Sequence, residues 1–292
     1  MPRGHLKSSI ITIGFAIQKV LNDFDTTILL TNAVWTKSRA FLSEIKEYLT
    51  RRSILPSLFG KFEDINRWTS DAVTIAQRKI PNKTQTIDTA GIEKSTTGHH
   101  YKIIIHDDLV DRQNVETFDQ RQKVKKFYSD SLDLLEPGGE MIILGTRWDE
   151  GDLYGDLIKN ESSKFDIYQS KATSNGKVYG QILFPKKFTN EILKDLLNSK
   201  GSREFYSQYM NEIFSSETKI FKGPARRWDM GDAQAIKSAI TFDPATSMKK
   251  ESCDSVVMAS GINGANQLCV LAYTIFREQE KLPINMMNKI FD

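Results

Sequence analysis

The feature that most constrains this chain is an apolar run that ends in two adjacent acids, Ile103–Asp108 (IIIHDD). Three consecutive β-branched residues predict a strand that is buried on both faces, as in a parallel sheet. In such sheets, ligands bind outside the carboxyl ends of the strands. Asp107 and Asp108 at that position could hold a divalent cation through one acid and orient a water molecule through the other. Acids after a strand are also common in helix caps and turns, so this motif alone leaves both interpretations open.

Helical and strand patterns alternate through the first half of the chain. Apolar residues at helical spacing predict one helix that begins near Ser8 and another over residues 34–49, followed by an irregular connection at 51–60. A polar helix is expected from about Val115 to Leu135, ending at the breaker Pro137-Gly138-Gly139. Strands are expected at 26–31, 73–78, 84–89, 103–108 and 140–144. This alternation predicts an α/β domain with a mostly parallel sheet and flanking helices.

The second half of the chain has a different organisation. Residues 183–209 are helix-rich, and residues 215–234 have the polar, Pro- and Gly-bearing character of a linker. Strand-like runs follow at 239–242, 255–259 and 267–275 without helices between them, which predicts a second domain with an antiparallel start. We therefore expect a first domain at 1–214, a linker at 215–234 and the beginning of another domain at 235–292.

Composition limits the possible partners and compartments only broadly. The 292 residues carry a formal charge of +3, which permits a nucleic-acid partner without requiring one. Cys253 and Cys269 lie at no metal-ligand spacing and are interpreted as reduced core residues. No apolar run is long enough to span a membrane, and no signal-peptide pattern is present. We expect a soluble, intracellular protein with no membrane partner.

The first eight residues, Met1–Ser8 (MPRGHLKS), contain part of a phosphate-binding pattern. Such a loop needs backbone N–H groups at a helix start, a lysine for the β/γ-phosphates and a hydroxyl for Mg²⁺. Lys7 and Ser8 supply the last two, but Met1 and Leu6 occupy the places of the usual glycines, and Gly4 alone can adopt a positive φ freely. A basic N-terminus before an ordinary helix is the alternative. The order of loop, helix, strand, helix and acidic strand matches a P-loop ATPase.

Several segments together resemble the large terminase subunits of tailed bacteriophages, the motors that pump double-stranded DNA into the prohead and cut it. The resemblance covers nearly the whole chain. Its motifs are PRGHLKS at 2–8, TGHH at 97–100, IIIHDDLV at 103–110, ILGTRW at 143–148, FYSQYMNE at 205–212 and FDPA at 242–245. It implies a P-loop ATPase domain of the ASCE type, followed by the start of a ribonuclease H-like nuclease domain.

The resemblance also implies roles for individual residues. Gly4, His5 and Leu6 would form the phosphate loop, Lys7 would contact the β/γ-phosphates of ATP, and Ser8 would ligate Mg²⁺. The catalytic side is implied by four further positions: Asp107 would hold Mg²⁺, Asp108 would polarise the attacking water, Arg3 would stabilise the γ-phosphate and Thr146 would couple phosphate loss to movement. Arg147 and Trp148 could instead be structural.

For the second domain, the family's nuclease uses two divalent ions, Mg²⁺ or Mn²⁺, held by three acids. Asp243 fits the first acid. Asp254 fits an auxiliary metal ligand and an ordinary turn acid equally well. By the resemblance, the strand before the phosphate loop and the remaining nuclease acids after Asp292 are missing. We therefore expect a compromised ATPase and no independent nuclease.

The implied partners are double-stranded viral DNA, the portal protein, the small terminase subunit and further copies in a ring, all in the cytoplasm of a bacterial host. Two other interpretations remain. One is a different P-loop DNA translocase or helicase, and the other is a non-catalytic remnant that binds DNA or partner subunits. Basic residues such as Lys123, Lys126 and Arg226 could contact phosphates, but solvated helix and linker positions explain them better, because their charge is diffuse.

Overall fold

The computed structural model describes residues 1–51, 53–94, 98–213, 235–243, 255–263 and 268–276. The chain forms two compact units, Met1–Thr218 and Lys219–Asp292, and each is considered by itself. The linker expected at 215–234 falls outside the described residues, as do Cys253 and Asp254.

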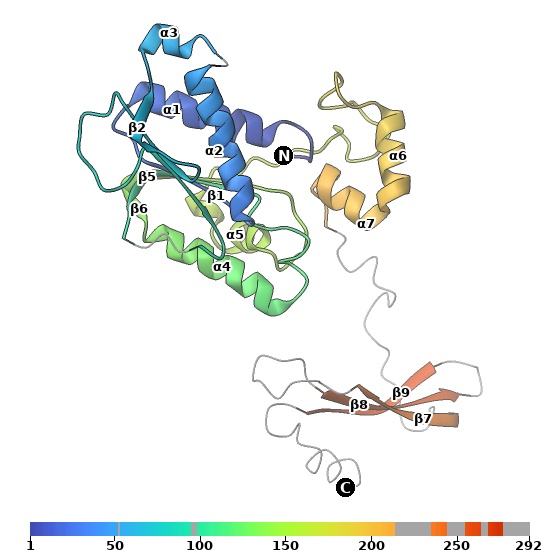
Figure 1. Cartoon of the computed structure of the whole chain (residues 1–292). Helices are drawn as coiled ribbons and strands as arrows, with labels where there is room; N and C mark the ends of the chain where they lie inside the picture. The colour runs from blue at the N-terminus through green and yellow to red at the C-terminus, as the bar shows by residue number, and fades with distance from the viewer. Residues whose placement is uncertain (52, 95–97, 214–234, 244–254, 264–267, 277–292) are drawn as a thin grey trace. The chain divides into compact units, whose positions relative to one another are not determined.

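Unit 1 is built on a six-stranded mixed sheet with the order β2-β3-β4-β1-β5-β6 (Figure 1). The strands are β1 (Ile28–Asn32), β2 (Glu63–Trp68), β3 (Ala72–Ile75), β4 (Ile87–Gly91), β5 (Tyr101–Asp107) and β6 (Leu135–Leu144). Strands β4, β1, β5 and β6 pair in parallel, whereas β2 and β3 add an antiparallel edge. The expected α/β class with a mostly parallel sheet is therefore confirmed.

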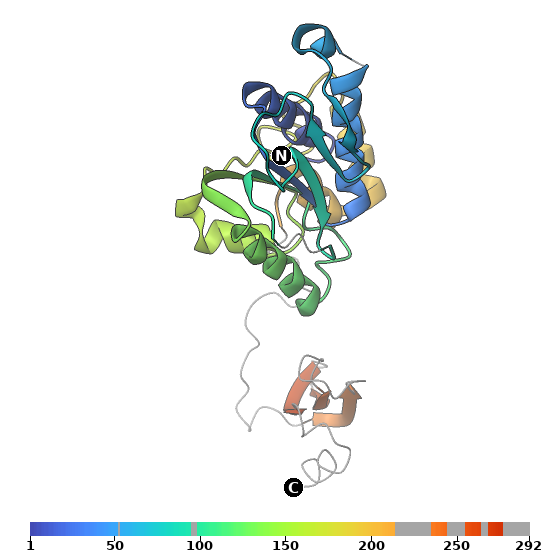
Figure 2. The same cartoon turned by 60° about the vertical axis from the view of Figure 1, so that its left-hand side comes forward.

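Helices cover both faces of this sheet (Figures 1 and 2). The π-helix η1 (Ser8–Phe15), α1 (Ala16–Asn22) and α2 (Trp35–Thr50) lie on one face, and α4 (Phe118–Leu132) and α5 (Leu153–Asn160) lie on the other. Alternate residues of β5 serve the two layers: Ile103 and Ile105 pack with α1 and α2, whereas the His106 ring faces α4. The β-branched run is thus buried on both sides, as its sequence predicts.

The structure corrects two local expectations. The connection at 51–60 contains a short helix, α3 (Leu55–Phe59). The polar helix ends at Leu132, before the Pro-Gly-Gly breaker, which lies inside the first half of β6. Pairing with β5 shifts there, from Tyr101↔Leu135 to Ile103↔Glu140, so the breaker forms an irregularity in the ladder. Proline is tolerated at this place because β6 is an edge strand of the sheet.

The last part of unit 1 forms a separate hydrophobic cluster, which we call the 172–211 segment. It contains α6 (Asn190–Lys200), α7 (Ser202–Phe205) and the π-helical turn η3 (Tyr206–Met210). Its core is made of Ala172, Val178, Phe188, Leu193, Phe205, Tyr209 and Met210. A short 3-10 turn, η2 (Ser162–Lys164), precedes it. No described helix is both long and apolar enough to cross a membrane.

Unit 2 contains a three-stranded antiparallel sheet of β7 (Ala235–Asp243), β8 (Ser255–Asn263) and β9 (Leu268–Phe276). β7 and β8 are longer than their apolar patterns indicate, whereas β9 has the expected length and lies one residue later. Asp243 is the last residue of β7 and pairs with Val256 of β8. The antiparallel start that the sequence predicts for this part of the chain is confirmed.

Candidate functional site

The N-terminal loop and the carboxyl end of β5 surround a cavity of about 330 Å³. Most of the residues that the sequence predicts for the phosphate site line it: Arg3, Gly4, Leu6, Lys7, Ser8, Asp108 and Thr146. Lys37 at the start of α2 and Lys187 line it too. Because four cationic side chains face a small cavity at a helix start, the site is suited to a phosphate-bearing anion.

Asp107, the residue before Asp108, does not line this cavity and is fully buried. Its Oδ2 accepts a 2.6 Å hydrogen bond from the Thr12 hydroxyl, and its backbone carbonyl accepts one of 2.7 Å from the Asn32 side chain. Its other carboxylate oxygen, Oδ1, is buried without a hydrogen-bond partner. An unpartnered buried carboxylate oxygen costs free energy, and a bound cation would remove that cost.

Burial raises the pKa of the Asp107 carboxyl. A hydrogen bond from the Thr12 hydroxyl opposes this shift, the negative charge of Asp108 adds to it, and the Ser8 hydroxyl again opposes it. The deprotonated form of Asp107 is therefore disfavoured in this structure. A divalent cation beside this oxygen would favour the deprotonated form.

Lys7 and Asp108 form an ion pair at the wall of the cavity. The Lys7 side chain is only 10% exposed, while that of Asp108 is 38% exposed. The backbone is strained at this pair. Leu6, the residue before Lys7, has φ +60°, and Asp108 has φ +51°. Aspartate tolerates this left-handed region, but leucine does so at a cost of roughly 1–2 kcal/mol. Leu6 therefore adopts the conformation for which the standard loop uses its second glycine.

The loop is anchored by the 172–211 segment. Arg3 donates its backbone N–H to the Gln208 carbonyl at 2.8 Å and its guanidinium to the Gln208 side-chain oxygen at 2.7 Å. Lys187 donates to the Gly4 carbonyl at 2.8 Å. The His5 ring stacks on Phe188 with a centroid separation of 4.7 Å. His5 therefore holds the loop from behind and does not line the 330 Å³ cavity.

The loop after β6 reaches the same segment. Thr146 is buried and lines the cavity, and the next carbonyl, that of Arg147, accepts a hydrogen bond from the Ser207 hydroxyl. Arg147 also donates to the fully buried side chain of Asp152 at 3.2 Å. Arg147 is thus built into the scaffold, which is the structural role that the sequence leaves open for it.

Thr12, Asn32 and His106 support the acidic pair but are not among the site residues that the sequence predicts. Thr12 follows Ser8 by four residues, so helical spacing could have placed it on the same face. His106 is fully buried, with one ring nitrogen 2.6 Å from the Thr31 hydroxyl and the other 3.0 Å from that of Ser131. Burial lowers the pKa of His106 to about 3, so this histidine is neutral.

The fit to a metal ion can be judged from the donors present. Among the described residues, no group of three or more His, Cys, Asp or Glu side chains is arranged to hold one. Mg²⁺ in phosphate-binding proteins commonly uses one or two carboxylates, water and the phosphates themselves. Asp107 with its free oxygen, together with the Ser8 hydroxyl, fits that mode. In unit 2, Asp243 is exposed at the end of β7, and Asp254 lies outside the described residues.

No protein-family model matches this sequence, and a search of curated proteins finds no match. The function therefore has to be argued from the site itself.

Proposed function

We propose that unit 1 binds Mg²⁺·ATP in the 330 Å³ cavity and hydrolyses it. The observation that carries this proposal is the fully buried Asp107, whose unpartnered oxygen lies next to a lysine–carboxylate pair at a helix start. Without a ligand, the unpartnered oxygen of Asp107 costs free energy, and among the described residues Lys7 and Asp108 bind only each other. A nucleotide phosphate with its cation would use all of them at once.

The residues divide into binding and chemical roles. Lys7 would exchange its contact with Asp108 for the β/γ-phosphates, with Lys37 and Lys187 adding positive charge. Bound Mg²⁺ would neutralise phosphate charge, held by Asp107 and the Ser8 hydroxyl. Once released by Lys7, the Asp108 carboxylate is free to orient the attacking water and accept its proton. Arg3 lines the same cavity and is positioned by Gln208, so it can add charge at the terminal phosphate.

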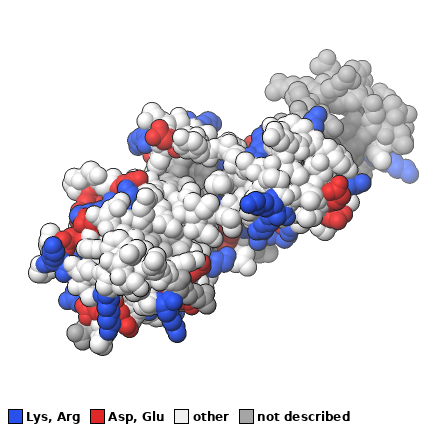
Figure 3. All heavy atoms as spheres, turned by 90° about the horizontal axis from the view of Figure 1, so that it is seen from above, with Lys and Arg blue, Asp and Glu red and all other residues white. Residues whose placement is uncertain are grey.

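The resemblance to large terminase subunits supports a more specific proposal. ATP hydrolysis would drive double-stranded viral DNA into a prohead, with the portal protein, the small subunit and further copies of this chain as partners in a bacterial cytoplasm. Asp243, with two Mg²⁺ or Mn²⁺ ions, would belong to the nuclease. On the face shown in Figure 3, basic and acidic side chains are interspersed, so the DNA contact is not proposed from surface charge.

Steady-state ATP hydrolysis tests the proposal. We expect slow, Mg²⁺-dependent turnover that falls by about 10²–10⁴-fold in Asp108→Asn, because a positioned proton acceptor contributes about that much. Binding of Mg²⁺·ATP should survive this substitution. Asp130→Asn, an exposed change on α4, is the matched control and should retain turnover. Hydrolysis that is equal in the two variants would refute the role of Asp108. Nucleotide binding without any turnover in the unsubstituted chain would favour the non-catalytic alternative.

A further inference from the structure

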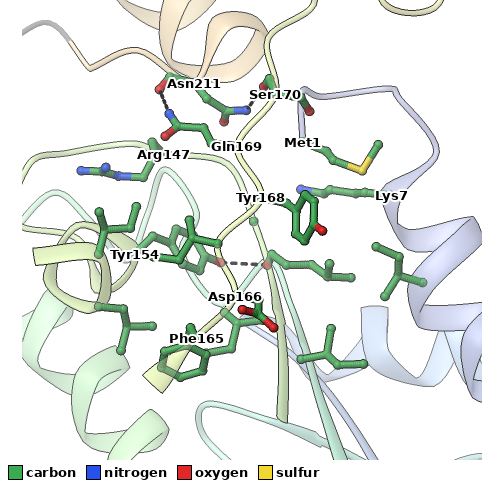
Figure 4. Close-up of a pocket in the computed structure, with 18 of the residues that line it drawn as sticks. Met1, Lys7, Arg147, Tyr154, Phe165, Asp166, Tyr168, Gln169, Ser170 and Asn211 are labelled. Carbon is green, nitrogen blue, oxygen red and sulfur yellow. Dashed lines mark hydrogen bonds between the residues drawn. The ribbon is translucent and has the colours of Figure 1, made fainter. Parts of the chain in front are cut away.

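Tyr154 on α5 is buried beside the site and does not line the 330 Å³ cavity. Burial raises the pKa of its phenol and the negative charge of Asp108 adds to this shift, so the hydroxyl keeps its proton. The hydroxyl donates to the Leu144 carbonyl at 3.1 Å, a hydrogen bond drawn as a dashed line in Figure 4. The same oxygen accepts the backbone N–H of Val110 at 3.3 Å. One hydroxyl therefore links the loop after β5 to the end of β6.

The linked loop contains the turn that sets the direction of the Asp108 side chain. Asp108 has φ +51°, a left-handed conformation that is uncommon for residues other than glycine. Its N–H donates to the Leu144 carbonyl at 2.9 Å, and its own carbonyl accepts from the Ala33 N–H at 3.2 Å. A side chain supplies the next hydrogen bond of the turn, from Val110 to Tyr154. Because the Cα–Cβ direction follows from the backbone angles, these hydrogen bonds determine where the carboxylate points.

The tyrosine ring is itself held in one place. An added Cβ at Gly145 would lie 2.1 Å from the ring, so glycine at this position lets the ring approach the end of β6. Asp152 caps the start of α5, and its buried carboxylate accepts from the N–H groups of Gly155 at 2.7 Å and Trp148 at 2.8 Å. Helix α5 and the loop after β6 are therefore fixed to each other, which holds the Tyr154 hydroxyl at the turn.

We infer that Tyr154 is a positioning residue for Asp108: its hydroxyl holds the turn at residues 108–110 and so directs the Asp108 carboxylate toward the attacking water. This inference rests on the proposed hydrolysis of ATP. Lys7 pairs with the carboxylate in this structure, but in the proposed mechanism Lys7 moves to the phosphates. The backbone turn is then what keeps the carboxylate in place, so the tyrosine matters most during turnover.

Steady-state kinetics of Tyr154→Phe tests this role, with Tyr128→Phe as the matched control. Both tyrosines pack in one hydrophobic cluster, but the Tyr128 hydroxyl donates to Glu161 at 3.3 Å, and neither of these two residues lines the cavity. We expect Tyr154→Phe to lower kcat at least about 10-fold and to change KM by less than about 2-fold, because a misplaced catalytic group affects the chemical step. Tyr128→Phe should change neither. An unchanged kcat in Tyr154→Phe, equal losses in both variants, or a change in KM alone would overturn the inference.

A double variant separates positioning from a general loss of structure. In the Asp108→Asn background, Tyr154→Phe should lower the remaining turnover by less than about 2-fold, because the hydroxyl acts through that carboxylate. A double variant in which the two separate losses multiply would show that Tyr154 acts independently of Asp108, which would also overturn the inference.

Hydrogen exchange supplies a readout that needs no turnover. The Val110 amide should exchange at least about 10-fold faster in Tyr154→Phe than in the unsubstituted chain, because it loses its buried partner, and Tyr128→Phe should leave this rate unchanged. An unchanged rate in Tyr154→Phe would overturn the inference even in a chain that hydrolyses ATP. Faster exchange together with no ATP turnover in the unsubstituted chain would instead refute the proposed function, and the positioning role with it.

Discussion

At the scale of single residues, the site contains two buried titratable neighbours whose pKa values shift in opposite directions. Burial raises the pKa of Asp107 and lowers that of His106 to about 3. Both shifts favour neutral side chains at these two positions. His106 satisfies this with the hydroxyls of Thr31 and Ser131. Asp107 has one oxygen without a partner, so it is the residue that a cation would change most.

The His106 shift predicts an acid-dependent stability. Its folded pKa lies below the unfolded value of 6.5, so its contribution is present above pH 6.5 and is lost as pH falls toward about 3. The slope approaches about 1.4 kcal/mol per pH unit within that window. Urea unfolding between pH 7 and pH 4 should show this loss in the natural chain and a smaller one in His106→Gln. The raised pKa of Asp107 makes a contribution of opposite sign to the pH dependence of stability. Because this contribution is present in both chains, the difference between their pH profiles isolates that of His106. Parallel pH profiles would contradict the assignment.

Leu6 gives a second prediction at this scale. Its left-handed conformation costs roughly 1–2 kcal/mol, and a glycine would remove that cost while losing about 0.5–1 kcal/mol of chain entropy. Leu6→Gly should therefore leave the free energy of unfolding unchanged or raise it by up to about 1.5 kcal/mol. Leu6→Val should lose about 1 kcal/mol or more, because β-branching disfavours this region. Denaturant titrations compare the two. A loss above about 2 kcal/mol in Leu6→Gly would show that leucine packing holds the loop.

The sequence predicts that Lys7, Ser8 and Asp108 lie close together in space. Lys7, Ser8 and Asp108 lie around one cavity because a helix start and the carboxyl end of a buried strand meet at the same edge of a parallel sheet. Lys187 and Gln208 could not be predicted in this way. They reach the loop from about 200 residues away in sequence, and no local pattern records such a contact.

At the scale of elements, the 172–211 segment holds both loops of the site. It binds the N-terminal loop through Gln208 and Lys187 and the loop after β6 through Ser207. A change at the phosphates could therefore reach this segment along two paths. This arrangement would give Thr146 and its neighbours the coupling role that the resemblance implies.

Gly4 provides a direct test of the anchoring. It has φ +77°, and an added Cβ would lie 3.1 Å from the Phe188 ring. Gly60 has φ +83° with nothing within 4 Å of such a Cβ, so Gly60→Ala measures the backbone strain alone. We expect Gly4→Ala to lose about 1 kcal/mol more than Gly60→Ala in thermal or urea unfolding and to weaken nucleotide binding. Equal losses would mean that the Phe188 contact is not constraining.

The elements that the sequence predicts best have a clear apolar period. β1 and β5 match closely because each contains a run of consecutive apolar residues, and α2 matches because its apolar positions repeat about every 3.6 residues. β2 is missed because its sequence, EDINRW, is mostly polar at an exposed edge. The Pro-Gly-Gly segment predicts the wrong end for the preceding helix, because an edge strand such as β6 can contain these residues.

At the scale of the whole molecule, the proposed nucleotide site lies entirely within unit 1. Asp243 belongs to unit 2, whose described part contributes no other acid to a metal site. Asp243 is the only acid among the described residues of unit 2, so the two-ion nuclease site that the resemblance implies stays a proposal.

This separation is testable with Asp243→Asn. The substitution should change Mg²⁺·ATP affinity by less than about 2-fold, because the residue lies outside the unit that contains the cavity. A larger loss of affinity in Asp243→Asn would contradict this separation of the two units.

The most direct test of the central claim is the affinity for Mg²⁺·ATP, measured by isothermal titration calorimetry on the natural chain and on Lys7→Ala. Lys46→Ala, which removes a lysine on α2 away from the cavity, is the matched control. We predict measurable binding in the natural chain and the control, and a loss of at least about 10-fold in Lys7→Ala, since a charge-assisted phosphate contact contributes about 1.5–3 kcal/mol. Equal affinities in all three chains, or no binding in any, would contradict a phosphate site at Lys7.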